Sequence, residues 1–174
     1  MTVKRPASGA LLTLLLAVAA LGQEAAVALE VQAAKPEPVA IIVHKQNELK
    51  SLTFKELRAL FKLEKRAWPA GAGNVSGKGV ALLLRASGAP EQDLVLEKVY
   101  EMNAGQLERF WVEGIYQGKI AAAPATKGSA AQAIKAVARD PAAISFVLLK
   151  DVTDDVKVLA IDGEAPGGEK YPLR

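Results

Sequence analysis

Apolar and polar residues alternate along the chain in blocks that predict strands and helices in turn. Short, nearly continuous apolar runs have the length of buried strands. Between them, apolar residues recur every three or four positions, as on one face of a helix. This alternation predicts an α/β sandwich with a mixed, mostly parallel sheet flanked by helices. The predicted strands are 39–43, 79–84, 120–123, 143–149 and 156–160.

The predicted helices carry their own start signals. In a capping pair, a short polar side chain and a Glu or Gln three residues later bond each other's backbone N–H groups. Proline suits the first position of a helix, because its missing N–H would have no partner there. The helices are therefore expected to begin at Thr53 with Glu56, at Pro90, at Asn103 with Gln106, and at Ser129 with Gln132.

The N-terminal 22 residues have the pattern of a secretory signal peptide. Lys4 and Arg5 precede an apolar stretch at 10–21, and small residues follow, with cleavage after Gly22 or after Ala28. The stretch is short for a membrane span, so the alternative is an uncleaved interfacial anchor. We expect a periplasmic or secreted protein.

The rest of the chain divides into three parts of different composition. Residues 23–38 are rich in alanine and read as a flexible leader. Residues 39–162 hold the predicted strands and helices and form one domain, and 163–174 read as a loose tail because of their glycines. The chain has no cysteine, so its core must hold the domain without disulfides.

The charge of the chain gives no support for a nucleic-acid partner. The formal net charge is +3, and removal of Lys4 and Arg5 with the signal peptide lowers it to about +1. The remaining basic residues are scattered among acidic ones and form no basic stripe.

A candidate anion site follows the strand at 79–84. Arg85 stands at the end of the strand, a Ser87-Gly88 turn follows, and a helix starts after Ala89. A strand that turns into a helix directs unpaired N–H groups at one spot, and an arginine there can bind an oxyanion. The expected contacts are the Arg85 guanidinium, the Ser87 hydroxyl, and the N–H groups of Gly88 and Ala89.

Features around the turn weaken this site. Pro90 has no N–H to offer, and Glu91 and Asp93 place negative charge where an anion would approach. The alternative interpretation is an ordinary helix start beside a surface arginine. Gly128 and Ser129 open a second helix and are secondary candidates for anion contact, with an ordinary N-cap as the alternative.

The sequence offers no pattern typical of catalysis, a resident metal or a cofactor. His44 is the single histidine, and no serine or aspartate completes a triad with it. One histidine without cysteine cannot build a zinc site of the usual kind. The acidic cluster at 151–155 could hold a hard cation weakly, but a solvated turn is the preferred interpretation. We therefore expect neither an enzyme nor a cofactor.

The order of several motifs resembles that of the phosphate-type periplasmic substrate-binding proteins. The motifs are Leu-Thr-x-x-Glu-Leu-x-x-Leu-Phe at 52–61, Trp-Pro-x-Gly at 68–71, Arg-Ala-Ser-Gly-Ala at 85–89, Phe-Trp at 110–111, Gly-Lys at 118–119, and the Pro-x-Ala-Ile-Ser-Phe-Val segment at 141–147. Together they cover roughly 39–159, most of the chain after the leader.

The resemblance implies a periplasmic-binding-protein-like fold of type II, with phosphate held between two lobes for an ABC transporter. It places Arg85, Ser87, Gly88 and Ala89 at the phosphate site, although Ala89 stands where the family has threonine. This chain has one lobe's worth of sequence, so a second copy or a partner would supply the other. The implied partners are phosphate or a similar oxyanion and an ABC permease. The alternative is an interaction module that keeps the lobe and binds another periplasmic protein.

Overall fold

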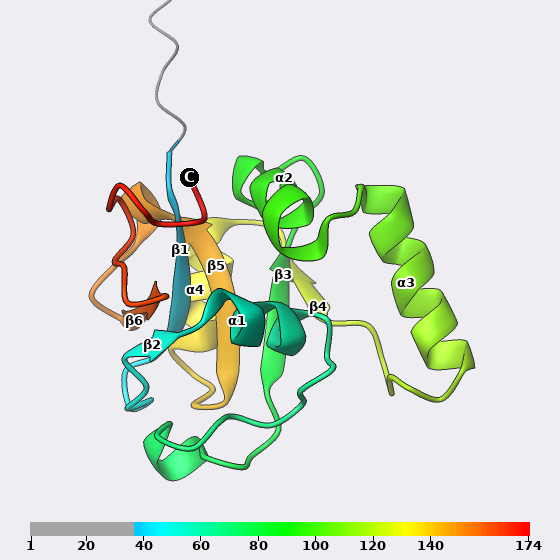
Figure 1. Ribbon diagram of the computed structural model, residues 1–174, viewed down its shortest axis with the longest axis horizontal. Helices are drawn as coiled ribbons and strands as arrows, with labels where there is room; N and C mark the ends of the chain where they lie inside the picture. The colour runs from blue at the N-terminus through cyan, green and yellow to red at the C-terminus, as the bar shows by residue number, and fades with distance from the viewer. Residues whose placement is uncertain (1–36) are drawn as a thin grey trace, which may run out of the picture. The chain divides into compact units, whose positions relative to one another are not determined.

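Six strands form one mixed sheet in the computed structural model, which describes residues 37–174 (Figure 1). The strand order is β2-β6-β1-β5-β3-β4. The predicted signal peptide, and the leader up to residue 36, lie outside the described residues. The strands are β1 Val39–His44, β2 Ser51–Leu52, β3 Ala81–Arg85, β4 Ala125–Lys127, β5 Ala143–Leu148 and β6 Val156–Ile161.

The direction of the strands distinguishes two edges of the sheet, meaning here the two sides at which strands begin or end. β3 runs parallel to β4 and β5, and β2 runs parallel to β6. β1 is antiparallel to both of its neighbours, β5 and β6. Five strands therefore end at the edge where Arg85 pairs with Lys127, which we call the carboxyl edge. β1 ends at the opposite edge, where His44 pairs with Val156.

Helices cover both faces of the sheet, as the alternating pattern predicts. Thr53 and Asn103 form complete capping boxes with Glu56 and Gln106, so both predicted start signals are confirmed. The hydrogen bonds from Thr53 lower the pKa of Glu56, because they favour its carboxylate. The helices are α1 Phe54–Phe61, α2 Pro90–Val95, the π-helical η2 Leu96–Tyr100, α3 Ala104–Tyr116 and α4 Ala130–Val137, with short turns η1 Gly73–Val75 and η3 Leu149–Asp151.

The core has two layers, one on each side of the sheet. On β1, Ile41 and Val43 pack into the larger layer with α1, η2 and α3, whereas Ile42 packs into the smaller layer with α4. This alternation explains why β1 is apolar at every position, because both faces of the strand are buried. At the centre of the larger layer, the Phe61 ring lies 5.8 Å from that of Phe146, measured between centroids.

Two expectations about the second half of the chain are corrected. The strand predicted at 120–123 lies after Pro124 instead, as β4, and 121–123 are exposed. The tail is not loose, because Tyr171 and Leu173 are buried. The Tyr171 hydroxyl donates to the Val39 carbonyl at 2.9 Å, and the Val39 N–H donates to the Leu173 carbonyl at 2.9 Å. The glycines of the tail lie in turns that precede the buried side chains of Tyr171 and Leu173. Within 37–174, no helix has the length and apolarity needed to cross a bilayer.

Candidate functional site

The carboxyl edge brings together all the residues predicted to contact an anion. β3 and β4 are parallel and in register, so the turn after Arg85 lies beside the turn after Lys127. The Lys127 carbonyl joins the two turns, since it accepts from the Ala86 N–H at 3.1 Å and from Arg85 Nη1 at 2.5 Å. The N-termini of α2 and α4 follow at the same edge. Ligands of open α/β sheets characteristically bind at this edge.

Arg85 is buried and held by the first turn of α2. Its Nε donates to Glu91 Oε1 at 2.7 Å, and the two side chains are 6% and 4% exposed. The Arg85 backbone N–H donates to Gln92 Oε1 at 3.2 Å. The sequence suggested that Glu91 would repel an anion; in the structure it is the partner that fixes the guanidinium. The alternative of a surface arginine is wrong.

The buried pair changes what Arg85 can offer. A guanidinium has five N–H donors, and the bonds to Glu91 and to the Lys127 carbonyl use Nε and one hydrogen of Nη1. Nη2 makes no hydrogen bond within the described part of the chain. Arg85 therefore keeps donors for a ligand, while Glu91 cancels its net charge.

The Ser87-Gly88 turn is exposed and supplies further donors. Gly88 has a φ of +83°, a left-handed conformation that glycine adopts without strain. Among described residues, no acceptor bonds the N–H of Ser87 or of Gly88. The N–H of Ala89 was also predicted as an anion donor, but it donates to the Ala86 carbonyl at 3.2 Å. Ser87 and Gly88 are therefore the parts of the turn open to an anion.

The second candidate turn satisfies its donors internally. The Ser129 hydroxyl accepts from the Gln132 N–H at 3.2 Å, and the Gln132 side chain accepts from the Gly128 N–H at 3.0 Å. Ser129 is therefore an N-cap, the alternative that the sequence left open, although the Gln132 side chain bonds Gly128 and so completes no capping box. Gly128 and Ser129 would have to break these bonds to contact an anion directly.

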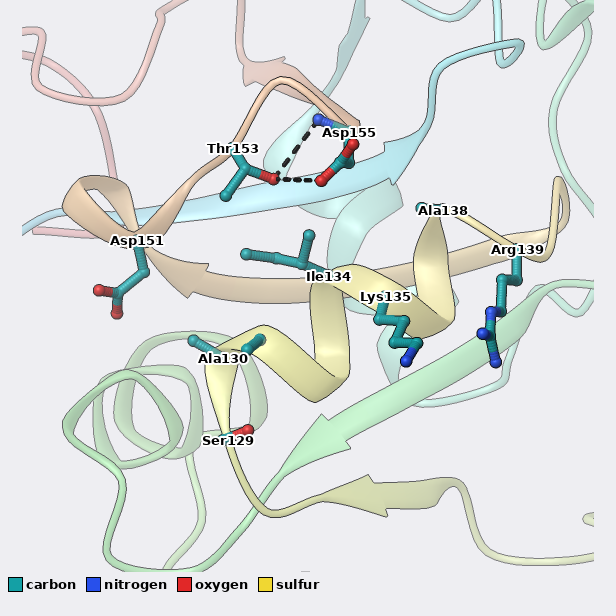
Figure 2. Close-up of a pocket in the computed structure, with 10 residues that line it drawn as sticks. Ser129, Ala130, Ile134, Lys135, Ala138, Arg139, Asp151, Thr153 and Asp155 are labelled. Carbon is teal, nitrogen blue, oxygen red and sulfur yellow. Dashed lines mark hydrogen bonds between the residues drawn. The ribbon is translucent and has the colours of Figure 1, made fainter.

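An open hollow of about 700 Å³ lies along α4 next to Ser129 (Figure 2). Its floor includes Ile134, and the loop at 151–155 faces it. Asp155 in this loop already accepts from the Thr153 hydroxyl at 3.2 Å. In Figure 2 the Lys135 side chain points away from Asp155. The carboxylates of Asp151 and Asp155 line this hollow, and Lys135 does not point toward them. The hollow is therefore unsuitable for phosphate, which these carboxylates would repel. Its lining comprises Ser129, Ala130, Ala131, Ile134, Lys135, Ala138, Arg139, Asp151, Thr153 and Asp155.

The remaining sequence candidates have structural roles. Trp68 and Trp111 are buried in the larger core layer. His44 lies at the opposite edge, and its Nδ1 accepts from the Gln46 N–H at 3.1 Å. Within residues 37–174, no three His, Cys, Asp or Glu side chains gather in the way that a metal ion requires.

Glu91 and the Lys127 carbonyl are the site features that the sequence did not reveal. Arg85 and Glu91 are separated by six residues and a turn, a spacing that matches no helix or strand period. The carbonyl of Lys127 comes from a strand that the sequence placed elsewhere. A glutamate in the first turn after an arginine-ended strand was the one available signal.

Solved structures of phosphate receptors share this fold. PstS of Borrelia burgdorferi has a TM-score of 0.60 and 14% identity, over 79% of this chain and 54% of its own. An ABC-type phosphate transport receptor of Vibrio cholerae has a TM-score of 0.59 and 15% identity, over 75% of this chain and 48% of its own. The fold is periplasmic-binding-protein-like.

A third structure carries phosphate itself. It is a Clostridium perfringens protein assigned as a phosphate ABC transporter substrate-binding protein and solved with bound phosphate. It has a TM-score of 0.58 and 20% identity, over 74% of this chain and 46% of its own. This chain thus spans about half the length of the structures that it matches. No protein-family model matches the sequence, and no curated protein matches it.

Proposed function

We propose that this protein is a secreted, non-enzymatic oxyanion-binding lobe that takes phosphate at the Ser87-Gly88 turn. The observation that carries the proposal is the hydrogen bonding of the Arg85 guanidinium. Glu91 and the Lys127 carbonyl hold its guanidinium, while Nη2 stays unbonded within the described residues, two positions before a turn with open N–H groups. Fixed donors of this kind bind an anion without reorganising first.

Each donor has a distinct part in the proposed complex. Arg85 Nη2 and the N–H groups of Ser87 and Gly88 would donate to phosphate oxygens, and the Ser87 hydroxyl would add a further bond. The start of α2 adds a partial positive charge. Because Glu91 cancels the charge of Arg85, the lobe alone should bind phosphate weakly.

The proposed site is half of a complete one. This chain spans only about half the length of the matched structures, so we infer that donors on the opposite side of the anion come from outside the described lobe. A second copy of the chain, an ABC permease or another periplasmic protein would supply them. The proposal assigns the lobe a place in phosphate capture for transport.

Calorimetry with inorganic phosphate tests the proposal, using the full chain and two variants of the turn. Ser87→Ala removes one donor and should weaken binding at the turn, while Ser87→Asp places a carboxylate there and should abolish binding at the turn. Ser76 is exposed at a distant turn, so Ser76→Ala and Ser76→Asp are matched controls that should bind like the wild type. Absence of heat in the wild-type protein at millimolar phosphate would remove the ligand, while leaving the fold unchanged.

A second candidate function is an interaction module, and the outer face of α3 favours it. Tyr116 is 92% exposed, and Val112 and Ile115 are exposed on the same side of the helix. Residues spaced by three or four positions form one stripe. An apolar stripe on a helix that stands beside the sheet in Figure 1 is a surface on which a protein partner could dock.

The two functions make separate predictions for an α3 variant. Val112→Ser combined with Tyr116→Ser should abolish capture of a partner from periplasmic extract if the lobe is an interaction module. The same double variant should bind phosphate like the wild type if the turn is the site. Loss of neither property would reject the interaction module.

A further inference from the structure

Three lysines line an open hollow of about 670 Å³ at the opposite edge of the sheet, away from the Ser87 turn. Lys45 and Lys50 come from the loop between β1 and β2, and Lys157 comes from the start of β6. This edge is at the bottom of Figure 1, where the loop after β1 turns back toward β2. The other lining residues are Gln46, Asn47, Glu48 and Asn74.

The loop that carries two of these lysines has a defined shape. The Asn47 N–H donates to the His44 carbonyl at 2.9 Å, and the Asn47 side-chain oxygen accepts from the Leu49 N–H at 3.0 Å. Lys157 Nζ donates to the Asn47 carbonyl at 2.8 Å. That ammonium therefore sits against the loop with two of its three hydrogens still to donate.

Asn47 lines the same hollow and carries an unpartnered buried donor beside it. Its side chain is among the lining residues and the residue is 1% exposed, yet its Nδ2 has no hydrogen-bond partner in the described part of the chain. A buried polar group without a partner is unusual, because burial deprives it of water. We assign an anion in the hollow as the acceptor that this donor lacks.

Glu48 is the only carboxylate among the described residues that line the hollow. Its side chain lies against Gly73, where an added Cβ would come within 2.7 Å of Glu48 Cδ. Glu48 is itself exposed beside that loop. The lining then carries three positive charges against one negative charge.

We propose that this hollow binds a phosphate-type oxyanion through Lys45, Lys50 and Lys157, with the Asn47 amide as a fourth donor. The site is separate from the one at the Ser87 turn and does not depend on it. Three ammonium groups, together with the free Nδ2 donor of Asn47, favour an anion over a cation as the ligand. A free phosphate ion and the phosphate of a lipid headgroup share this chemistry.

Nitrogen-15 NMR of the full chain resolves the two edges in one phosphate titration. The Asn47 side-chain amide reports on the hollow, and the backbone amides of Ser87 and Gly88 report on the proposed function. We expect a saturable shift of the Asn47 amide with phosphate. The phosphate affinity obtained from this shift should be at least tenfold weaker in the variant Lys50→Gln/Lys157→Gln. The matched control is Lys55→Gln/Lys170→Gln, which changes two exposed lysines outside the hollow and should behave like the wild type.

Vesicles distinguish the source of the phosphate group. Phosphatidylglycerol vesicles that capture the wild-type chain, but not the hollow variant, identify a lipid headgroup as the ligand. A shift of Asn47 with inorganic phosphate but no vesicle capture identifies a free ion. The proposal is overturned if neither ligand affects Asn47, or if the hollow variant responds like the wild type. A shift at Ser87 alone would support the proposed function and reject the hollow.

Discussion

Two arginine–glutamate pairs in this protein have the same 2.7 Å separation and opposite surroundings. Arg85 and Glu91 are 6% and 4% exposed, at the carboxyl edge of the sheet. Arg58 on α1 and Glu101 after η2 are 31% and 61% exposed. An equal N–O distance therefore does not mean an equal interaction energy, because water screens the exposed pair and not the buried one.

The difference teaches what the buried pair is for. Burying two charges costs several kcal/mol per ion, and their attraction roughly repays it, so such pairs are poor sources of stability (on the order of zero net). A pair that adds little stability yet occupies the edge where ligands bind in such sheets is more simply explained by positioning. On this account Glu91 orients the Arg85 guanidinium, whereas Glu101 forms an exposed ion pair that contributes little to stability.

The largest expected effect is that of Glu91→Gln. This change leaves the charge of Arg85 buried without its counter-ion, so the free energy of unfolding should fall by about 3 kcal/mol. Urea unfolding followed by circular dichroism measures it. Phosphate should restore part of the loss, since the uncompensated guanidinium binds the anion more strongly. A cost below about 1 kcal/mol would mean that the two pairs are equivalent.

The tyrosines extend the contrast between buried and exposed groups to high pH. Burial raises the pKa of Tyr100 and of Tyr171, whereas Tyr116 is exposed. Groups with a raised folded-state pKa stabilise the fold fully below the unfolded pKa near 10 and lose that contribution above it. Unfolding free energy should therefore fall by roughly 1–2 kcal/mol between pH 9 and 10.5.

Two tyrosine variants isolate this contribution from that of the lysines. Tyr100→Phe should reduce the slope of unfolding free energy against pH above 10, because one of the two shifted groups is gone. Tyr116→Phe should leave the slope unchanged. Equal slopes in all three proteins would show that the buried tyrosines do not control the alkaline transition.

The helix starts at the carboxyl edge provide a smaller test. Ser129 caps α4, whereas Ala89 at the start of α2 has no capping side chain. Ala89→Ser should raise the unfolding free energy by about 0.5–1 kcal/mol, and Ser129→Ala should lower it by a similar amount. Thermal unfolding of the two variants checks both signs. A destabilising Ala89→Ser would indicate that Arg85 and Glu91 leave no room for a cap.

The smallest expected effect is that of Glu101→Gln. It breaks an ion pair of the same length as the buried one, but the change should cost about 0.5 kcal/mol and vanish in 1 M salt. Urea unfolding at low and high salt measures it. A cost comparable to that of Glu91→Gln would remove the distinction between the two pairs.

Local signals in the sequence predict the fold well. The capping boxes at Thr53 and Asn103, the helix start at Pro90 and the buried strand β1 follow from short-range chemistry and are confirmed. The predictions for β4 and for the tail are wrong because contacts with distant parts of the chain determine the structure of both segments. β4 exists through its pairing with β3, and Tyr171 is anchored by a bond to Val39, 132 residues away.

The candidate site was predictable in position and less so in chemistry. A strand, a Ser-Gly turn and a helix start are sequential features, so their place at the carboxyl edge follows once the sheet is parallel. The partner of Arg85 depends on how α2 folds back over the end of β3, which no spacing rule contains. The sequence therefore predicted where the turn lies and missed Glu91, the group that neutralises Arg85.

Replacement of the buried pair by Arg85→Met/Glu91→Met tests most directly the claim that this pair positions a ligand donor. Apolar side chains of similar size should keep the unfolding free energy within about 1 kcal/mol of the wild type, or raise it. In a nitrogen-15 NMR titration of the folded variant, the Ser87 and Gly88 amides should then show no shift with phosphate. Wild-type phosphate shifts of these two amides in that variant, or its failure to fold, would contradict the account.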